Sequence, residues 1–129
     1  MNSFVIDAYA WIEYFNGTKQ GEKVKNIIEN PKNKIFTNAV TVAELASSYR
    51  RNKLNFDEEK RIILDLSKIY NINLEFAEEA GRLHANIKKE RKNIGMADVF
   101  ILLTAKKLKA KVVTCDEDFI GLKEVFMLK

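Results

Sequence analysis

Four acidic residues in this sequence lie close to the ends of predicted structural elements. Asp7 directly follows "SFVI", Glu44 comes shortly after "KIFT", and Asp116 comes just after "KVVT". The fourth acid, Asp98, lies at the start of the apolar stretch "MADVFILLTAKKLK". Carboxylates brought together from such distant segments would raise one another's pKa or bind a cation.

Each of these acids also has a purely structural explanation. Asp7 and Asp116 are good helix-capping or turn residues. Thr41 and Glu44 match the capping box T-x-x-E, and Asp98 would complement the positive end of a helix dipole. For any one acid the structural explanation is at least as good as a chemical one. The chemical explanation depends on all four acids lying at one edge of the fold.

The hydrophobic pattern alternates between strands and helices. Short apolar runs predict strands at 3–6, 34–37, 111–114 and 125–128, with a possible edge strand at 72–75. Helical spacing of apolar residues predicts helices at 7–15, 21–30, 41–52, 57–70, 75–92 and 96–109. The last helix is apolar on most faces, so we expect it to be central and buried.

This alternation predicts an α/β fold in which a central, mostly parallel sheet is flanked by helices in a three-layer sandwich. In such sheets the functional crevice lies outside the carboxyl ends of the strands, where the strand order reverses. The acids that follow strands are therefore expected to meet there.

Composition predicts one domain over residues 1–129. The chain is 47% hydrophobic with five glycines and one proline, which is enough for a core, and its net charge of +4 mildly favours a polyanionic partner. A single cysteine cannot form an internal disulfide, no signal-like apolar region follows Met1, and no apolar run is long enough to span a bilayer. The expected location is the cytoplasm.

The available ligand types favour Mg²⁺ or Mn²⁺ over zinc. Carboxylate oxygens and water suit these hard cations, whereas a zinc site would need several histidines and cysteines. The chain has only His84 and Cys115, which we interpret as ordinary packing residues. A magnesium site on an α/β sheet indicates phosphate chemistry, with a metal-activated water as the nucleophile.

Several families with that chemistry do not match. A haloacid-dehalogenase-type phosphatase would have a second Asp two residues after Asp7, where this chain has Tyr9. A response-regulator receiver would have paired acids after the first strand. A phosphate-binding loop of the form G-x-x-x-x-G-K is absent from the sequence.

The segments "FVIDAYAWIEYF", "TNAVTVAEL" and "GMADVFILLTAKKLKAKVVTCDEDF" resemble the PIN domain family, and within it the small VapC-like toxin endonucleases of prokaryotic toxin–antitoxin pairs. Four motifs in the same order and at suitable spacing, ending in T-x-D-x-D-F, carry this resemblance. The middle of the chain, 50–92, is generic amphipathic helix.

The resemblance implies a set of site residues. Asp7, Glu44, Asp98 and Asp116 match the acidic quartet of the family, and Asp118 matches a fifth acid found in some members. Metal-dependent cleavage of RNA is the implied activity. The implied ligands of Mg²⁺ or Mn²⁺, direct or through water, are Asp7, Asp98 and Asp116, with Asp118 added, and Glu44 would orient or deprotonate the attacking water.

Two neighbouring positions bear on the geometry of this implied site. Thr114 matches a small hydroxyl residue that supports the acids by hydrogen bonding. Asn38 stands where many relatives have Ser, a departure that would affect the surroundings of the metal more than its ligands.

The resemblance also implies partners: an RNA substrate, a cognate antitoxin and a second copy of the chain in a homodimer. Two other functions remain open from sequence. One is an RNA-processing nuclease of the same fold without an antitoxin, and the other is a non-catalytic RNA-binding domain. The intact acidic quartet argues against the second.

Basic and aromatic side chains could contact these partners. Two basic clusters could bind RNA phosphates or simply solvate helix ends: Arg50, Arg51 and Lys53, and Lys88, Lys89, Arg91 and Lys92. Aromatic residues could line an antitoxin groove or belong to the core, and helical spacing favours the core for Trp11 and Phe15, with Tyr14 undecided.

Overall fold

A computed structural model describes residues 2–114, 116, 119, 121–122 and 124–128. Cys115 and Asp118 lie outside the described residues. The strands are β1 (Ser3–Ile6), β2 (Lys34–Asn38), β3 (Lys68–Tyr70), β4 (Lys111–Thr114) and β5 (Val125–Met127). The helices are α1 (Ala8–Asn16), α2 (Lys19–Ile28), α3 (Ala39–Arg51), α4 (Asp57–Leu66), α5 (Leu74–Lys88) and α6 (Met96–Leu108).

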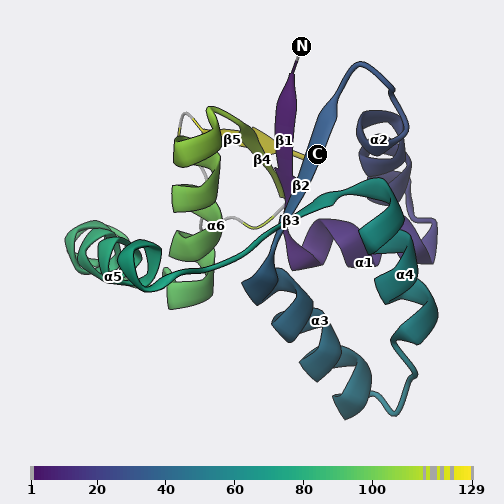
Figure 1. Cartoon of the computed structure of the whole chain (residues 1–129), viewed down its shortest axis with the longest axis horizontal. Coiled ribbons are helices and arrows are strands. Elements are labelled where there is room, and N and C mark those ends of the chain that lie inside the picture. Colours follow the sequence, from purple (N-terminus) through teal and green to yellow (C-terminus); the bar gives the residue numbers. More distant parts are fainter. Residues whose placement is uncertain (1, 115, 117–118, 120, 123, 129) are drawn as a thin grey trace.

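The strands form one sheet in the order β3-β2-β1-β4-β5, and every neighbouring pair is parallel. This confirms the predicted α/β fold. In Figure 1, α5 and α6 lie on one side of the sheet, and α1, α2 and α4 lie on the other. The arrangement is the expected three-layer sandwich.

The predicted edge strand at 72–75 is wrong. The edge strand is Lys68–Tyr70, within the segment predicted as the end of a helix. Asn73 instead caps α5, because its Oδ1 accepts a hydrogen bond of 2.8 Å from the backbone N–H of Phe76. Helix α4 ends earlier than predicted, at Leu66, and the next residue, Ser67, has extended backbone.

The two faces of the sheet carry separate parts of the core. Phe4 and Ile6 of β1 belong to a cluster with side chains of α1, α2 and α4, whereas Val5 packs with Ile101 and Ala105 of α6. This alternation follows from the two-residue period of a strand, in which successive side chains point to opposite faces. Both faces of β1 are therefore buried, as in other parallel sheets.

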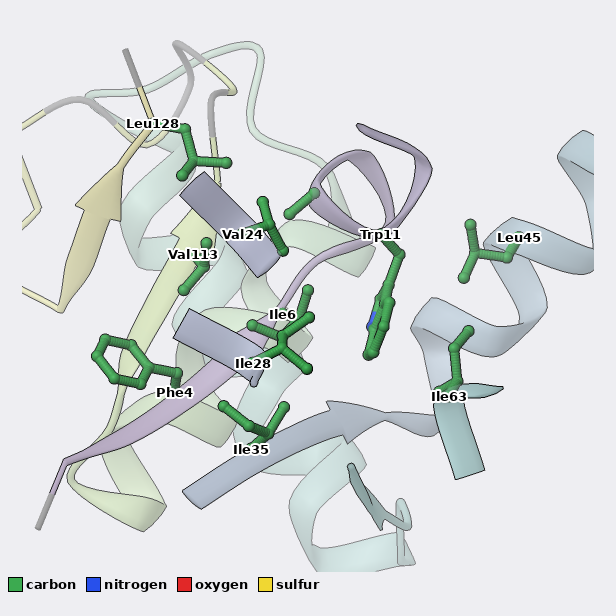
Figure 2. Packing of buried hydrophobic residues seen from close by; sticks show 11 residues of the cluster. Phe4, Ile6, Trp11, Val24, Ile28, Ile35, Leu45, Ile63, Val113 and Leu128 are labelled. Carbon is green, nitrogen blue, oxygen red and sulfur yellow. The ribbon is translucent and has the colours of Figure 1, made fainter. Parts of the chain in front are cut away.

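Trp11 is the largest fully buried side chain of the first cluster. Figure 2 shows it between Ile6 on one side and Leu45 and Ile63 on the other. The core prediction for Trp11 is therefore confirmed. Phe15 stacks on the Trp11 ring with a centroid distance of 5.7 Å and is itself half-buried.

Helices α1 and α2 pack very closely at one point. Gly21 is buried, and a Cβ atom at this position would overlap with the backbone carbonyl of Glu13. Any other residue would force the two helices apart, so this glycine is required by packing rather than by its backbone angles.

Helix α6 is central, as its apolar sequence predicts. Its buried side chains contact the sheet through Ile101 and Ala105 and pack against Phe76 and Ala80 of α5 through Leu103. In the described residues, no helix combines the length and apolar character that crossing a membrane would need.

Candidate active site

The order of the strands places the functional edge of the sheet around β1. This strand lies between β2 and β4: the chain first runs from β1 to β2 and β3 on one side and then crosses back to β4 and β5 on the other side. The N-termini of α1, α3 and α6 gather at the carboxyl end of these strands (Figure 1). This is the edge at which the acids are expected to meet.

An open pocket of about 260 Å³ occupies this edge. Its walls come from α1, α3, α6 and the segment after β4. The residues that line it are Asp7, Ala8, Tyr9, Ile12, Glu44, Ser48, Arg51, Asp98, Ile101 and Asp116. The four acids predicted from the motifs thus share one pocket, although they are spread over more than a hundred residues of sequence.

Asp7 is almost completely buried at the end of β1, with 5% of its surface exposed. Its Oδ1 caps α1 by accepting a 2.8 Å hydrogen bond from the backbone N–H of Ala10. The pKa of Asp7 is raised from 3.8 to about 7, mainly by burial and also by the negative charges of Asp116 and Glu44, against the opposing effect of hydrogen bonds from Thr114 and Ala10.

Thr114 connects two of the acids. This buried last residue of β4 donates a hydrogen bond to the side chain of Asp7, and its Oγ1 accepts one of 2.9 Å from the backbone N–H of Asp116. The supporting contact expected for this hydroxyl is therefore present. It fixes Asp7 relative to the segment that carries Asp116.

Glu44 is not part of a capping box. Helix α3 begins at Ala39 and is capped by Asn38, so Glu44 lies beyond its first turn, and the Oγ1 of Thr41 has no hydrogen-bond partner among the described residues. Glu44 is half-buried, and its pKa is raised first by burial and then by the charges of Asp98 and Asp116. The capping-box explanation is therefore wrong for this residue, and its chemical role stays a prediction.

Asp98 both caps α6 and lines the acidic pocket. It is the third residue of α6, and its Oδ2 accepts a hydrogen bond of 3.1 Å from the backbone N–H of Gly95. The same side chain lines the pocket and raises the pKa of Glu44. Capping and a place in the site are therefore compatible at this position.

The pocket offers the right donor type for a hard cation, but its acids are not gathered into a closed cage. Among the described residues, no group of three or more Asp, Glu, His and Cys side chains is placed so that it could hold a metal ion. Mg²⁺ is usually bound through one or two carboxylates and keeps several waters. The carboxylates thus fit an ion that retains much of its hydration, and the described residues of the lining include no histidine or cysteine for zinc.

Asn38 ends β2 and is completely buried. Its Oδ1 accepts a 2.7 Å hydrogen bond from the N–H of Val40, and its Nδ2 donates one of 2.7 Å to the Oγ1 of Thr104. Thr104 in turn donates to the carbonyl of Phe100 at 2.7 Å. Asn38 therefore joins β2, α3 and α6 beside the pocket with hydrogen bonds on both sides of its amide.

The two basic clusters are placed differently. Arg51 lines the acidic pocket, whereas Arg50 and Lys53 line a neighbouring pocket of about 680 Å³ on the far part of α3. The cluster of Lys88, Lys89, Arg91 and Lys92 follows the end of α5 and contributes nothing to the lining of the acidic pocket.

Sequence reasoning missed two polar lining residues, Tyr9 and Ser48. The signal for Ser48 was present, because Glu44, Ser48 and Arg51 are spaced four and three residues apart and so share one face of a helix. Tyr9 follows Asp7 by two residues in the first turn of α1, and no periodic pattern distinguishes it.

The family model of the PIN domain matches residues 4–125. No curated protein sequence matches the chain. The structure resembles a toxin–antitoxin complex from Klebsiella pneumoniae, with a TM-score of 0.71, 22% identity and coverage of 97% of both chains.

Two further solved structures show the same fold. One is VapBC2 from Rickettsia felis bound to a DNA fragment from its promoter, with a TM-score of 0.75, 16% identity and coverage of 97% of this chain and 96% of that one. The other is VapC20 from Mycobacterium tuberculosis, described as a toxin that cleaves the sarcin–ricin loop, with a TM-score of 0.72, 12% identity and coverage of 93% and 95%. The family model spans all five strands and all six helices described above except Ser3 of β1 and the last two residues of β5, and on that match the chain belongs to the PIN domain family.

Proposed function

We propose that this protein is a metal-dependent endoribonuclease that hydrolyses RNA phosphodiester bonds and acts in the cytoplasm as the toxin of a type II toxin–antitoxin pair. The observation that carries the proposal is the meeting of Asp7, Glu44, Asp98 and Asp116 in one pocket at the strand-order switch. Membership of the PIN domain family and the likeness to toxin–antitoxin structures support it.

In the proposed mechanism Asp7, Asp98 and Asp116 would hold Mg²⁺ or Mn²⁺, directly or through water. Asp118 would be a further ligand. The bound cation would supply charge stabilisation for the phosphoryl oxygens and a more acidic water.

Glu44 acts as the general base in this proposal. Burial, and then the charges of Asp98 and Asp116, raise the pKa of its carboxyl, which makes the carboxylate a stronger base. One carboxylate oxygen would accept the proton of the attacking water. Through its hydrogen bonds, Thr114 would keep the side chain of Asp7 and the backbone of Asp116 at a fixed distance from each other during the reaction.

The first test is cleavage of a panel of tRNA, ribosomal RNA fragments and single-stranded RNA with Mg²⁺ or Mn²⁺, against EDTA. Asp98→Asn should reduce the cleavage rate at least about a hundredfold, while Asp65→Asn, which removes an exposed carboxylate of α4, should cut like the wild type. Cleavage that persists in EDTA, or a fully active Asp98→Asn, would contradict the proposal.

The partners need separate measurements. We expect induced expression in a bacterial host to stop growth, Asp98→Asn to be harmless, and co-expression of a small neighbouring antitoxin gene to restore growth. Light scattering of the purified protein should give the mass of a homodimer. RNA cleavage without any effect on growth would favour an RNA-processing nuclease instead.

A further inference from the structure

Among the residues that the structure describes, Arg51 is the one basic residue that lines the acidic pocket. It lies at the C-terminal end of α3 and its side chain is exposed. Four carboxylates line the same pocket, so a polyanion that approaches it meets repulsion unless a cation stands at its entrance. Arg51 is placed to supply that positive charge.

The helical spacing sets where this charge lies. Glu44, Ser48 and Arg51 are on one face of α3, and Arg51 is two turns from Glu44, about 10 Å along the helix axis. The guanidinium therefore belongs to the rim of the pocket, with the half-buried Ser48 between it and the acids. A group bound at Arg51 would be a neighbour of the group that reacts at Glu44.

The guanidinium forms no ion pair with a carboxylate of the described part of the chain. The ion pairs found among the described residues are Arg82 with Glu78, Lys106 with Glu124 and Lys107 with Glu79, and Arg51 takes part in none of them. A planar guanidinium presents N–H groups in a fork that matches two oxygens of a phosphate. Its donors are thus available to a phosphodiester.

Tyr9 supplies an aromatic surface in the same pocket. It lies in the first turn of α1, two residues after Asp7, and 52% of its surface is exposed. Single-stranded RNA is commonly bound by stacking of unpaired bases on aromatic rings, together with basic contacts to phosphates. An exposed tyrosine and an arginine on the walls of one pocket are the two parts of such a site.

We propose that Arg51 and Tyr9 form a nucleotide subsite at the rim of the acidic pocket, in which Arg51 binds a phosphate next to the one that is cleaved and Tyr9 stacks on an unpaired base. The proposal rests on the proposed function and names two residues that position its substrate. It makes the rim selective for flexible single strands, because a base within a duplex cannot reach the ring.

The chain contains a matched control for Arg51. Arg50 is its neighbour in the last turn of α3, is equally exposed and carries the same charge, but it lines the other pocket with Tyr49 and Lys53. If the two arginines only complement the helix dipole or solvate the surface, their replacement has the same effect. If the subsite exists, only Arg51 matters strongly.

The test is fluorescence anisotropy with a labelled 12-nucleotide single-stranded RNA of mixed sequence, in EDTA so that no cleavage occurs. Arg51→Ala should weaken binding about fivefold or more and reduce the slope of log affinity against log salt by about 0.7. Arg51→Lys should recover part of the loss, and Arg50→Ala should stay within about twofold of the wild type. Thermal unfolding of each variant should match the wild type, because both side chains are exposed.

Tyr9 is tested in the same assay. Tyr9→Ala should weaken binding about fivefold or more, and Tyr9→Phe, which keeps the ring, should bind like the wild type. Equal losses for Arg50→Ala and Arg51→Ala, no loss for Tyr9→Ala, or no binding by the wild type would overturn the subsite. Because the assay needs no catalysis, Arg51-dependent binding without any cleavage on the RNA panel would count against the nuclease and leave the subsite standing.

Discussion

Asp7 and Asn38 occupy corresponding places at the ends of neighbouring strands. Each ends or directly follows a central strand, each caps the next helix through its Oδ1, and both are nearly or fully buried. One is a carboxyl group whose pKa is raised to about 7, and the other is an amide with a hydrogen bond on each side. The fold thus performs the same capping in two chemically different ways.

Comparing Asp7 with Asn38 shows that folding needs the capping oxygen at these positions but not the negative charge of Asp7. Asn and Asp are about equally good N-caps, so capping does not require a charge at Asp7. A buried carboxylate near Asp116 and Glu44 opposes folding because its charge is poorly solvated and repelled. The charge at Asp7 is therefore best explained by the proposed reaction, whereas Asn38 is explained by structure.

The largest expected effect is that of Asp7→Asn on cleavage. The amide can still cap α1, but it removes a proposed metal ligand, so the cleavage rate should fall about a thousandfold, or about 4 kcal/mol of transition-state stabilisation. In EDTA at pH 8 the same variant should unfold at higher urea concentration, with a gain of about 1 kcal/mol. Glu78→Gln, which removes an exposed carboxylate of α5, should change stability by less than about 0.5 kcal/mol. An Asp7→Asn protein that is less stable than the wild type would contradict the conclusion that the charge at Asp7 opposes folding.

The reverse exchange, Asn38→Asp, should be harmful to the fold. Its carboxylate can still cap α3 but cannot donate to Thr104, whose own proton is already given to the carbonyl of Phe100. We expect a loss of about 2–3 kcal/mol in the free energy of unfolding at pH 8, measured by urea denaturation, and a smaller loss at pH 5, where the acid is protonated. Asn71→Asp, at an exposed loop position, should be nearly neutral. Equal stabilities for these two variants would show that the amide of Asn38 is not needed.

The smallest expected effect is on the pH dependence of stability without metal. The folded pKa of Asp7, about 7, lies above the ordinary value of 3.8, so the folded protein binds more protons than the unfolded chain between these values. Stability should therefore fall as pH rises from 5 to 7, by about 1–2 kcal/mol in total, which is within the limit of 1.4 kcal/mol per unit for one group. Urea unfolding in EDTA at several pH values measures this slope. Asp7→Asn should remove most of it, and an unchanged slope would assign the titration to other groups.

Much of this arrangement could be predicted from sequence. The spacing of hydrophobic residues indicates which segments are helices and which are strands, and the position of an acid directly after a strand indicates at which edge of the sheet it lies. The meeting of the acids followed from the rule for parallel sheets. The start of α3 could not be predicted, because Asn38 and Thr41 are both good caps, and the choice depends on Thr104, which lies far along the chain. The edge strand was misplaced because "SKIY" continues a helical pattern and becomes a strand only through its pairing with β2.

The register of the central strand also sets the time at which the site can form during protein synthesis. Val5 pairs with Val112, so β1 lacks one neighbour until more than a hundred further residues have left the ribosome. At about 5–20 residues per second this takes roughly 5–20 seconds. Asp7 is made more than a hundred residues before Asp116, and the pocket between them cannot exist on a nascent chain before Asp116 has been made. A ribonuclease built in this way would be inactive while its first hundred residues are synthesised and would gain its cutting site only after Asp116 had left the ribosome.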